Sequence, residues 1–135
     1  TVHIHLWDAR QHLLSGEYHI AVEKLSAIRG ELPPSDASFS RAYIDLEICY
    51  CLVRQDLLDD ALCRYVGLPV LDLEKLDVDE QLVATWMRLE MATRDARFGD
   101  LPALERELSA TKAKYAEYKS GLMAKLGALN LECSC

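Results

Sequence analysis

The chain has 135 residues, and half of them are apolar, which is enough for one domain with a hydrophobic core and argues against disorder. Its 22 acidic and 15 basic side chains give a formal net charge of −7, which disfavours nucleic acid as a partner. No apolar run reaches the length of about 18 residues that a membrane span needs, and no secretory signal is recognised at the start, so we expect neither.

The first two expected helices form a pair. Apolar residues recur at helical spacing over residues 2–14 and again over residues 18–28. Gly16 interrupts the pattern between them, and Gly30 with Pro33 is expected to end the second helix. This order predicts an antiparallel helical hairpin.

The same apolar pattern returns when every position is moved forty residues along the chain. A single helix could match by chance, but here the register holds across a helix, a turn and a second helix. We therefore predict a second hairpin of the same build. The first set is Leu6, Ala9, Leu13, Tyr18, Ala21, Val22, Leu25 and Ile28, and its counterparts are Leu46, Cys49, Val53, Leu58, Ala61, Leu62, Tyr65 and Leu68.

A weaker third copy lies a further 43 residues on. Asp77 and Glu80 predict the start of its first helix as a variant of the capping box, and Gly99 with Asp100 predicts a turn and the start of the second. Its apolar positions are Leu89, Ala92 and Ala96 in the first helix and Leu101, Leu104 and Leu108 in the second, whereas Glu105 and Thr111 depart from the pattern.

The last expected helix is unusually long. Its apolar residues follow a spacing close to seven residues, and four lysines, at positions 112, 114, 119 and 125, make it locally basic. One interpretation is a capping helix that covers the last apolar face of a stack. The other is a coiled-coil seam, for a partner or for self-association. The apolar positions are Leu104, Leu108, Tyr115, Tyr118, Leu122, Leu126 and Leu129.

These features resemble the tetratricopeptide repeat (TPR), a helix-turn-helix unit with small residues where its helices cross and a proline near its end. The matching residues are Ala9, Cys49 and Ala92 in the first helices, Ala21 and Ala61 in the second, Gly16 and Tyr18 at the turn, and Pro33 at the end. The repeat unit of this family is about 34 residues long. The shifts of 40 and 43 residues in this chain therefore imply longer connections, at residues 33–37 and 68–77.

The resemblance implies an all-α fold made of a single TPR-like domain, residues 1–135. Three antiparallel hairpins, over about residues 2–30, 38–68 and 78–130, would stack as a right-handed α-solenoid with a long C-terminal capping helix.

In the TPR family the first helix of each unit lines a concave face, which would carry three arginines in this acidic chain. An arginine fork matches a carboxylate, so the hypothesis is a groove for an acidic or C-terminal peptide segment, with three aromatic residues as apolar anchors. The alternative is that the arginines pair with neighbouring carboxylates on the surface. The candidate partner-binding residues are Arg10, Tyr43, Tyr50, Arg54, Trp86, Thr93 and Arg97.

We therefore expect a protein–protein interaction scaffold or adaptor that holds a peptide or helix of a partner protein. The alternative is a dedicated chaperone or regulator that sequesters an amphipathic helix of a secreted or assembling subunit. Small acidic TPR-like proteins also resemble such chaperones.

The sequence predicts no enzyme, no metal and no cofactor. His3, His5, His12 and His19 lack a second ligand cluster, and no thiol or hydroxyl is recognisable beside an oriented base. No Gly-rich phosphate loop occurs. The ending Cys133-Ser134-Cys135 resembles the doubly prenylated terminus of small GTPases, but nothing else does, so we expect a polar tail.

The cysteines indicate in which cellular compartment the protein is expected. Their number is five, and three of them fall inside apolar helical stripes, where cysteine acts as a small hydrophobe. We therefore expect no disulfide framework and a reducing, cytoplasmic location.

Overall fold

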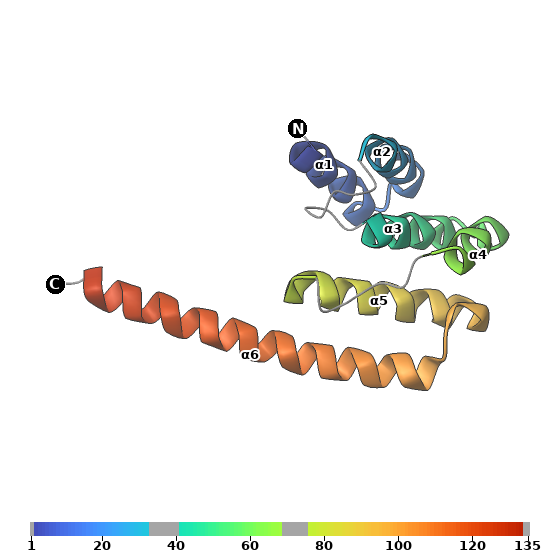
Figure 1. The fold of residues 1–135 in the computed structure, drawn as a ribbon. Helices are drawn as coiled ribbons and strands as arrows, with labels where there is room; N and C mark the ends of the chain where they lie inside the picture. Colours follow the sequence, from blue (N-terminus) through green and yellow to red (C-terminus); the bar gives the residue numbers. More distant parts are fainter. Residues whose placement is uncertain (1, 33–40, 69–75, 134–135) are drawn as a thin grey trace.

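The computed structural model describes residues 2–32, 41–68 and 76–133, and this part of the chain is all-α, as predicted, with no strand (Figure 1). Pro33, the start of the second hairpin near residue 38, and Cys135 lie outside the described residues. The helices are α1 (Val2–Leu14), α2 (Tyr18–Glu31), α3 (Arg41–Arg54), α4 (Leu58–Val66), α5 (Val78–Arg94), the short 3-10 helix η2 (Ala96–Phe98) and α6 (Leu101–Cys133).

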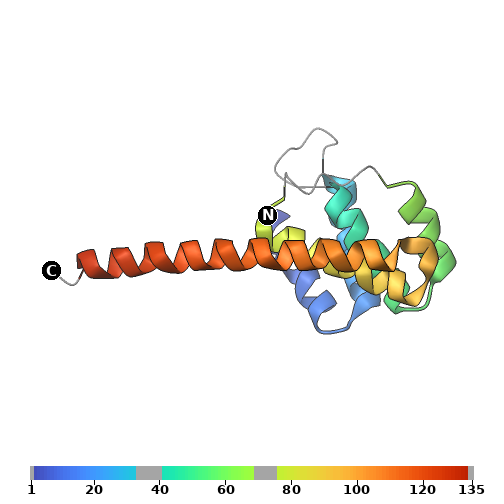
Figure 2. The ribbon, with the colours of Figure 1, turned by 90° about the horizontal axis from the view of Figure 1, so that it is seen from below.

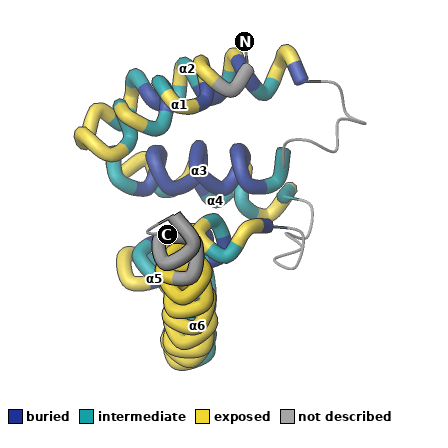
Figure 3. Tube along the Cα trace, turned by 90° about the vertical axis from the view of Figure 1, so that its left-hand side faces the viewer, coloured by how far each residue is buried: buried dark blue, intermediate teal, exposed yellow. Residues whose placement is uncertain are grey.

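The helices lie in three successive tiers. The pairs α1 with α2, α3 with α4, and α5 with α6 each pack together, and α3 also packs against α2 above it and α5 below it (Figures 1 and 3). Every residue from Tyr43 to Val53 is buried, so α3 is the central helix of the molecule. The core is therefore continuous from the first tier to the third.

The predicted shift of forty residues is reproduced in the backbone of the turns. Gly16 and Asp56 both adopt positive φ, 80° and 62°, and each lies two residues beyond the end of its helix, α1 or α3. The amide of Gly16 donates to Leu13 and that of Glu17 to His12, and the same two bonds recur forty residues later in the second hairpin. This pattern is the Schellman motif, in which a left-handed residue ends a helix. Both hairpins therefore turn in the same way.

The side chains repeat as well. Every residue of the two matched apolar sets is buried in the core or packs against it. Ala9 and Cys49 are fully buried at the same position of the first helices, as are Ala21 and Ala61 in the second. Small side chains at these positions let the paired helices approach closely.

One predicted helix end agrees with the structure and one was wrong. α2 ends at Glu31, one residue after Gly30. α5 ends at Arg94, so Ala96 and Arg97 do not belong to the first helix of the third hairpin. Asp95 has an extended backbone, and its side chain accepts the amide of Arg97, which starts η2 instead.

The start of α5 was predicted correctly. Asp77 and Glu80 form the capping box, in which the amide of Asp77 donates to the Glu80 carboxylate at 3.3 Å. α6 likewise begins directly after Asp100 and accommodates Pro102 in its first turn.

α6 has two parts with different surroundings. Its first half runs antiparallel to α5 and buries Leu104 and Thr111. Its second half extends past the end of α5, with no other helix beside it in either view (Figures 1 and 2). Among the described residues, no helix combines the length and the apolar character that crossing a bilayer requires.

Candidate functional site

The first helices of the three hairpins, α1, α3 and α5, contact one another in order through charged and aromatic side chains. Arg10 of α1 binds Glu47 of α3, and Tyr50 of α3 lies against Trp86 of α5. We name this surface the α1/α3/α5 face. Its members with at least partly exposed side chains are Trp7, Arg10, Arg54, Trp86, Glu90 and Thr93.

Arg10 already binds a carboxylate within the chain, that of Glu47. Its Nε and Nη2 donate to the two carboxylate oxygens of Glu47, each at 2.9 Å, and its guanidinium lies 5.1 Å from the ring centre of Tyr43. Burial raises the pKa of Glu47, and the hydrogen bond from Arg10 opposes that rise in part. Tyr43 is buried, and that burial raises the pKa of its hydroxyl. Arg10 therefore has little free capacity for a second carboxylate.

Three aromatic rings run from α2 through α3 to α5. Tyr18 meets Tyr50 edge-on at 6.2 Å between ring centres, and Tyr50 meets Trp86 at 5.5 Å. Tyr50 is buried and its pKa is raised to about 12 by that burial, whereas Trp86 keeps 42% of its surface exposed. Tyr50 thus supports Trp86 from beneath, and Trp86 presents the accessible ring.

Arg54 makes a longer contact with its carboxylate partner than Arg10 does. Its nearest carboxylate oxygen, from Glu90 of α5, is 3.6 Å away, and about a third of each side chain is exposed, 34% and 37%. Its guanidinium lies 5.4 Å from the ring centre of Tyr18. Its Nε is shielded from solvent and has no hydrogen-bond partner among the described residues. An incoming carboxylate can compete for this arginine.

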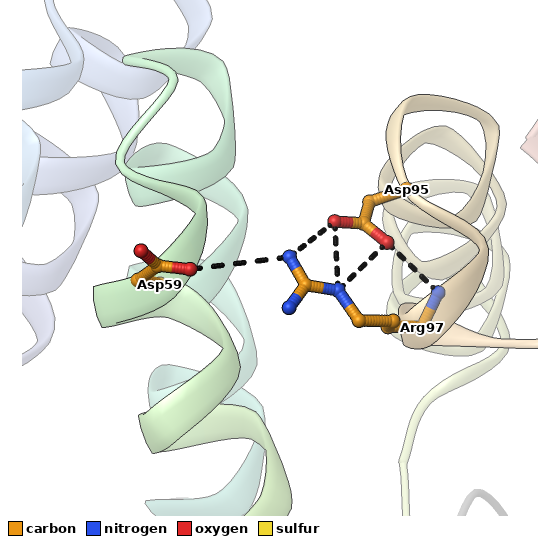
Figure 4. A network of polar contacts seen from close by, with 3 residues as sticks. All are labelled: Asp59, Asp95 and Arg97. Atoms are coloured by element: carbon orange, nitrogen blue, oxygen red, sulfur yellow. Dashed lines mark hydrogen bonds and ion pairs between the residues drawn. The ribbon is translucent and has the colours of Figure 1, made fainter.

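Arg97 lies away from the other two arginines in sequence and in its contacts. In η2 it binds Asp95 at 2.7 Å and approaches Asp59 of α4 at 4.0 Å (Figure 4). The hydrogen bonds from Arg97 lower the pKa of Asp95. Arg97 therefore joins α4 to η2, beside the buried contact between Tyr65 and Phe98.

Thr93 is exposed on α5, and its hydroxyl donates to the Leu89 carbonyl at 2.8 Å.

Of the predicted site residues, the structure brings five together on neighbouring helices: Arg10, Tyr43, Tyr50, Arg54 and Trp86. It assigns Arg97 to a different contact.

Sequence reasoning missed three members of this surface, Trp7, Glu47 and Glu90. It also did not predict that Tyr18 of α2 lies against Tyr50 and Arg54. The same repeat could have found the three members, since they occupy one position of the 40- and 43-residue shifts. Trp7 stands exposed there, whereas the two glutamates meet Arg10 and Arg54. Pairing of the arginines with carboxylates was the stated alternative, and the structure identifies Glu47 and Glu90 as two of the partners.

A further group of polar side chains lies between α1 and α2. A shallow cavity of about 180 Å³ lies between α1 and α2, where Asp8 forms an ion pair with Lys24. His12 is 3.2 Å from Glu17 and 3.8 Å from Asp8. Across the described ranges, no three potential metal ligands come together.

Two cysteines lie deep inside the molecule. Burial raises the pKa of Cys49 and of Cys51 to about 12 each, so neither thiol ionises near neutral pH. Both behave as small core residues.

Comparison of the chain with family models, with curated proteins and with solved structures finds no match in any of the three.

Proposed function

We propose that the chain is a TPR-like helical scaffold that binds a segment of another protein on the α1/α3/α5 face. The hairpin repeat supports the architecture, because the turn and the apolar contacts of the first hairpin recur at a shift of forty residues. Arrays of this kind present an extended surface to partners.

A single observation carries the binding proposal: Trp86 is partly exposed, rests on the buried ring of Tyr50 and stands one turn before Glu90, whose contact with Arg54 is 3.6 Å long. Tryptophan and arginine are the residues most enriched in binding hot spots. A ring held from beneath loses little conformational freedom on binding, so its contact area is gained at low entropic cost.

The same geometry defines the expected ligand. Trp86 would contact an apolar side chain of the partner, and Arg54 would exchange the 3.6 Å contact with Glu90 for a bidentate bond to an acidic side chain or a C-terminal carboxylate. Arg10 would serve as a structural residue, since Glu47 already satisfies its fork.

The test is selection of peptides from a phage-displayed random library on the purified full-length chain. The peptides selected should combine an apolar residue with a nearby carboxylate. Their affinity should fall about tenfold or more in Trp86→Ala and in Arg54→Glu. Arg106→Glu, an exposed arginine of α6, is the matched control for charge and should leave binding unchanged.

Peptides that bind Trp86→Ala and Arg54→Glu as well as they bind the unmodified chain would refute this site, as would a selection that enriches no sequence. Peptides that bind as amphipathic helices rather than as short extended segments would favour the chaperone-like alternative.

A further inference from the structure

Glu90 is the acidic residue beside Trp86 and Arg54 on the α1/α3/α5 face. It lies one turn after Trp86 in α5, and 37% of its side chain is exposed. Its Oε2 lies 3.6 Å from Nη1 of Arg54, and it makes no other ion pair among the described residues. A partner that takes Arg54 therefore removes the cation that Glu90 faces.

A carboxylate of the partner and Glu90 would compete for the same end of Arg54. The Nε atom of Arg54 is shielded from solvent, so a ligand has to approach the outer Nη atoms. Nη1 is the atom that faces Glu90. An ion pair that is this exposed is weak, so the exchange is feasible. It would leave Glu90 next to a second negative charge, which repels it.

In the described helix α5, no arginine is free to replace Arg54. Arg94 stands one turn after Glu90, at a spacing where glutamate and arginine commonly pair. Its Nη1 instead donates to Asp56 at 2.6 Å. Three further arginines are also paired within the chain: Arg10 with Glu47, Arg88 with Glu107 and Arg97 with Asp95. After the exchange, a cation for Glu90 would have to come from the partner.

The charge of the whole chain acts in the same direction. Its net charge of −7 repels a segment that is only acidic, and a basic residue in the same segment reduces that repulsion. Specificity depends on the penalty for the wrong partner as well as on attraction to the right one. A purely acidic segment would meet that penalty at Glu90.

We propose that Glu90 sets the charge specificity of the α1/α3/α5 face, which selects a segment that combines an apolar residue with both an acidic and a basic side chain. The acidic group binds Arg54, the apolar group contacts Trp86, and the basic group pairs with Glu90. This inference rests on the proposed function, and it narrows the class of partner from an acidic segment to one of mixed charge.

The test repeats the phage selection on three full-length proteins: the unmodified chain, Glu90→Gln and Glu105→Gln. Peptides selected on the unmodified chain should contain a basic residue besides the apolar and acidic ones. Peptides selected on Glu90→Gln should keep the apolar and acidic residues and lose the basic one. Glu105→Gln removes the same charge from an exposed position of α6, so there the basic residue should persist.

A double-mutant cycle measures the contact itself. A peptide selected on the unmodified chain, and a twin with its basic residue replaced by glutamine, are titrated by fluorescence anisotropy. The twin should bind the unmodified chain about three- to fivefold more weakly than the selected peptide does. The two peptides should bind Glu90→Gln equally, and high salt should reduce the difference on the unmodified chain.

The outcomes separate this inference from the proposed function. The role of Glu90 alone would be overturned by peptides that need Trp86 and Arg54 but contain no basic residue, or keep it on Glu90→Gln, or bind the unmodified chain no better than their twins. A selection that enriches no sequence, or peptides indifferent to Trp86→Ala and Arg54→Glu, would overturn both the peptide site and its charge specificity.

Discussion

The Arg10–Glu47 pair joins α1 to α3 through a buried carboxylate. Glu47 is almost fully buried, and burial raises its folded-state pKa above the ordinary value. Between the unfolded and folded pKa values the folded state binds more protons, so this group makes the free energy of unfolding fall as pH rises through that window. Arg10 limits the effect by lowering the pKa of Glu47.

Replacing Arg10 by methionine should therefore destabilise the protein in a pH-dependent way. Without its partner, Glu47 is a buried uncompensated charge at about pH 7.5, which costs about 3 kcal/mol. At a lower pH, such as about pH 5, more of the Glu47 carboxyl is protonated, because burial raises its pKa, and part of the loss is recovered. Urea unfolding at both pH values measures the difference. Adding Glu47→Gln should remove the pH dependence, and an equal loss at both pH values would contradict the argument.

Two glycines should respond to alanine with opposite signs. Gly16 has φ of 80° in the turn after α1, so a Cβ there costs about 1–2 kcal/mol. Gly30 lies within α2 with open space around it, so alanine should stabilise the helix by up to about 1 kcal/mol. Chemical unfolding of the two variants checks both signs, and a stabilising Gly16→Ala would mean that the turn differs from the one described.

At the scale of single residues the shift of forty predicted the turn at Gly16 and its counterpart at Asp56, but not the positive φ of Asp56. Glycine often marks a left-handed position, whereas aspartate adopts one only occasionally. Asp56 also accepts a 2.6 Å bond from Arg94 of α5. No local pattern reveals a partner 38 residues away.

At the scale of elements, helix pairs depend on small side chains at their crossings. Ala21 and Ala61 are fully buried at equivalent positions of α2 and α4. Ala21→Leu or Ala61→Leu should overpack the crossing and lower the free energy of unfolding by about 1–3 kcal/mol. Ala27→Leu, on the exposed side of α2, is the control and should change stability by less than about 0.5 kcal/mol. Equal effects at Ala21 and Ala27 would mean that the crossing is loose.

The sequence predicted all six long helices, because each carries an apolar stripe or a clear start signal. It missed the end of α5, since the apolar pattern continues to Ala96 while Asp95 bends the backbone. The half of α6 that caps α5 and the half that projects also look alike in sequence. The two halves of α6 differ in whether α5 is long enough to lie beside them. The apolar spacing of α6 does not reveal that length.

At the scale of the whole molecule, three tiers stack in chain order and leave α3 at the centre. The forty-residue repeat predicted the tiers, but it did not predict how deeply α3 is buried. Tyr43 and Tyr50, expected as surface anchors, lie beneath side chains of neighbouring helices, and the exposed ring is Trp86. Burial of this kind depends on both neighbouring tiers, so it cannot be read from one helix.

Native-state hydrogen exchange is the measurement that tests this arrangement most directly. Amides of α3 should exchange only through global unfolding, because every residue from Tyr43 to Val53 is buried. Amides of α6 beyond Lys119 should exchange orders of magnitude faster than those near Leu104, because no other helix lies beside the second half of α6. Protection that is uniform along α6, or lower in α3 than in α1, would contradict the stacked arrangement from which the second half of α6 projects.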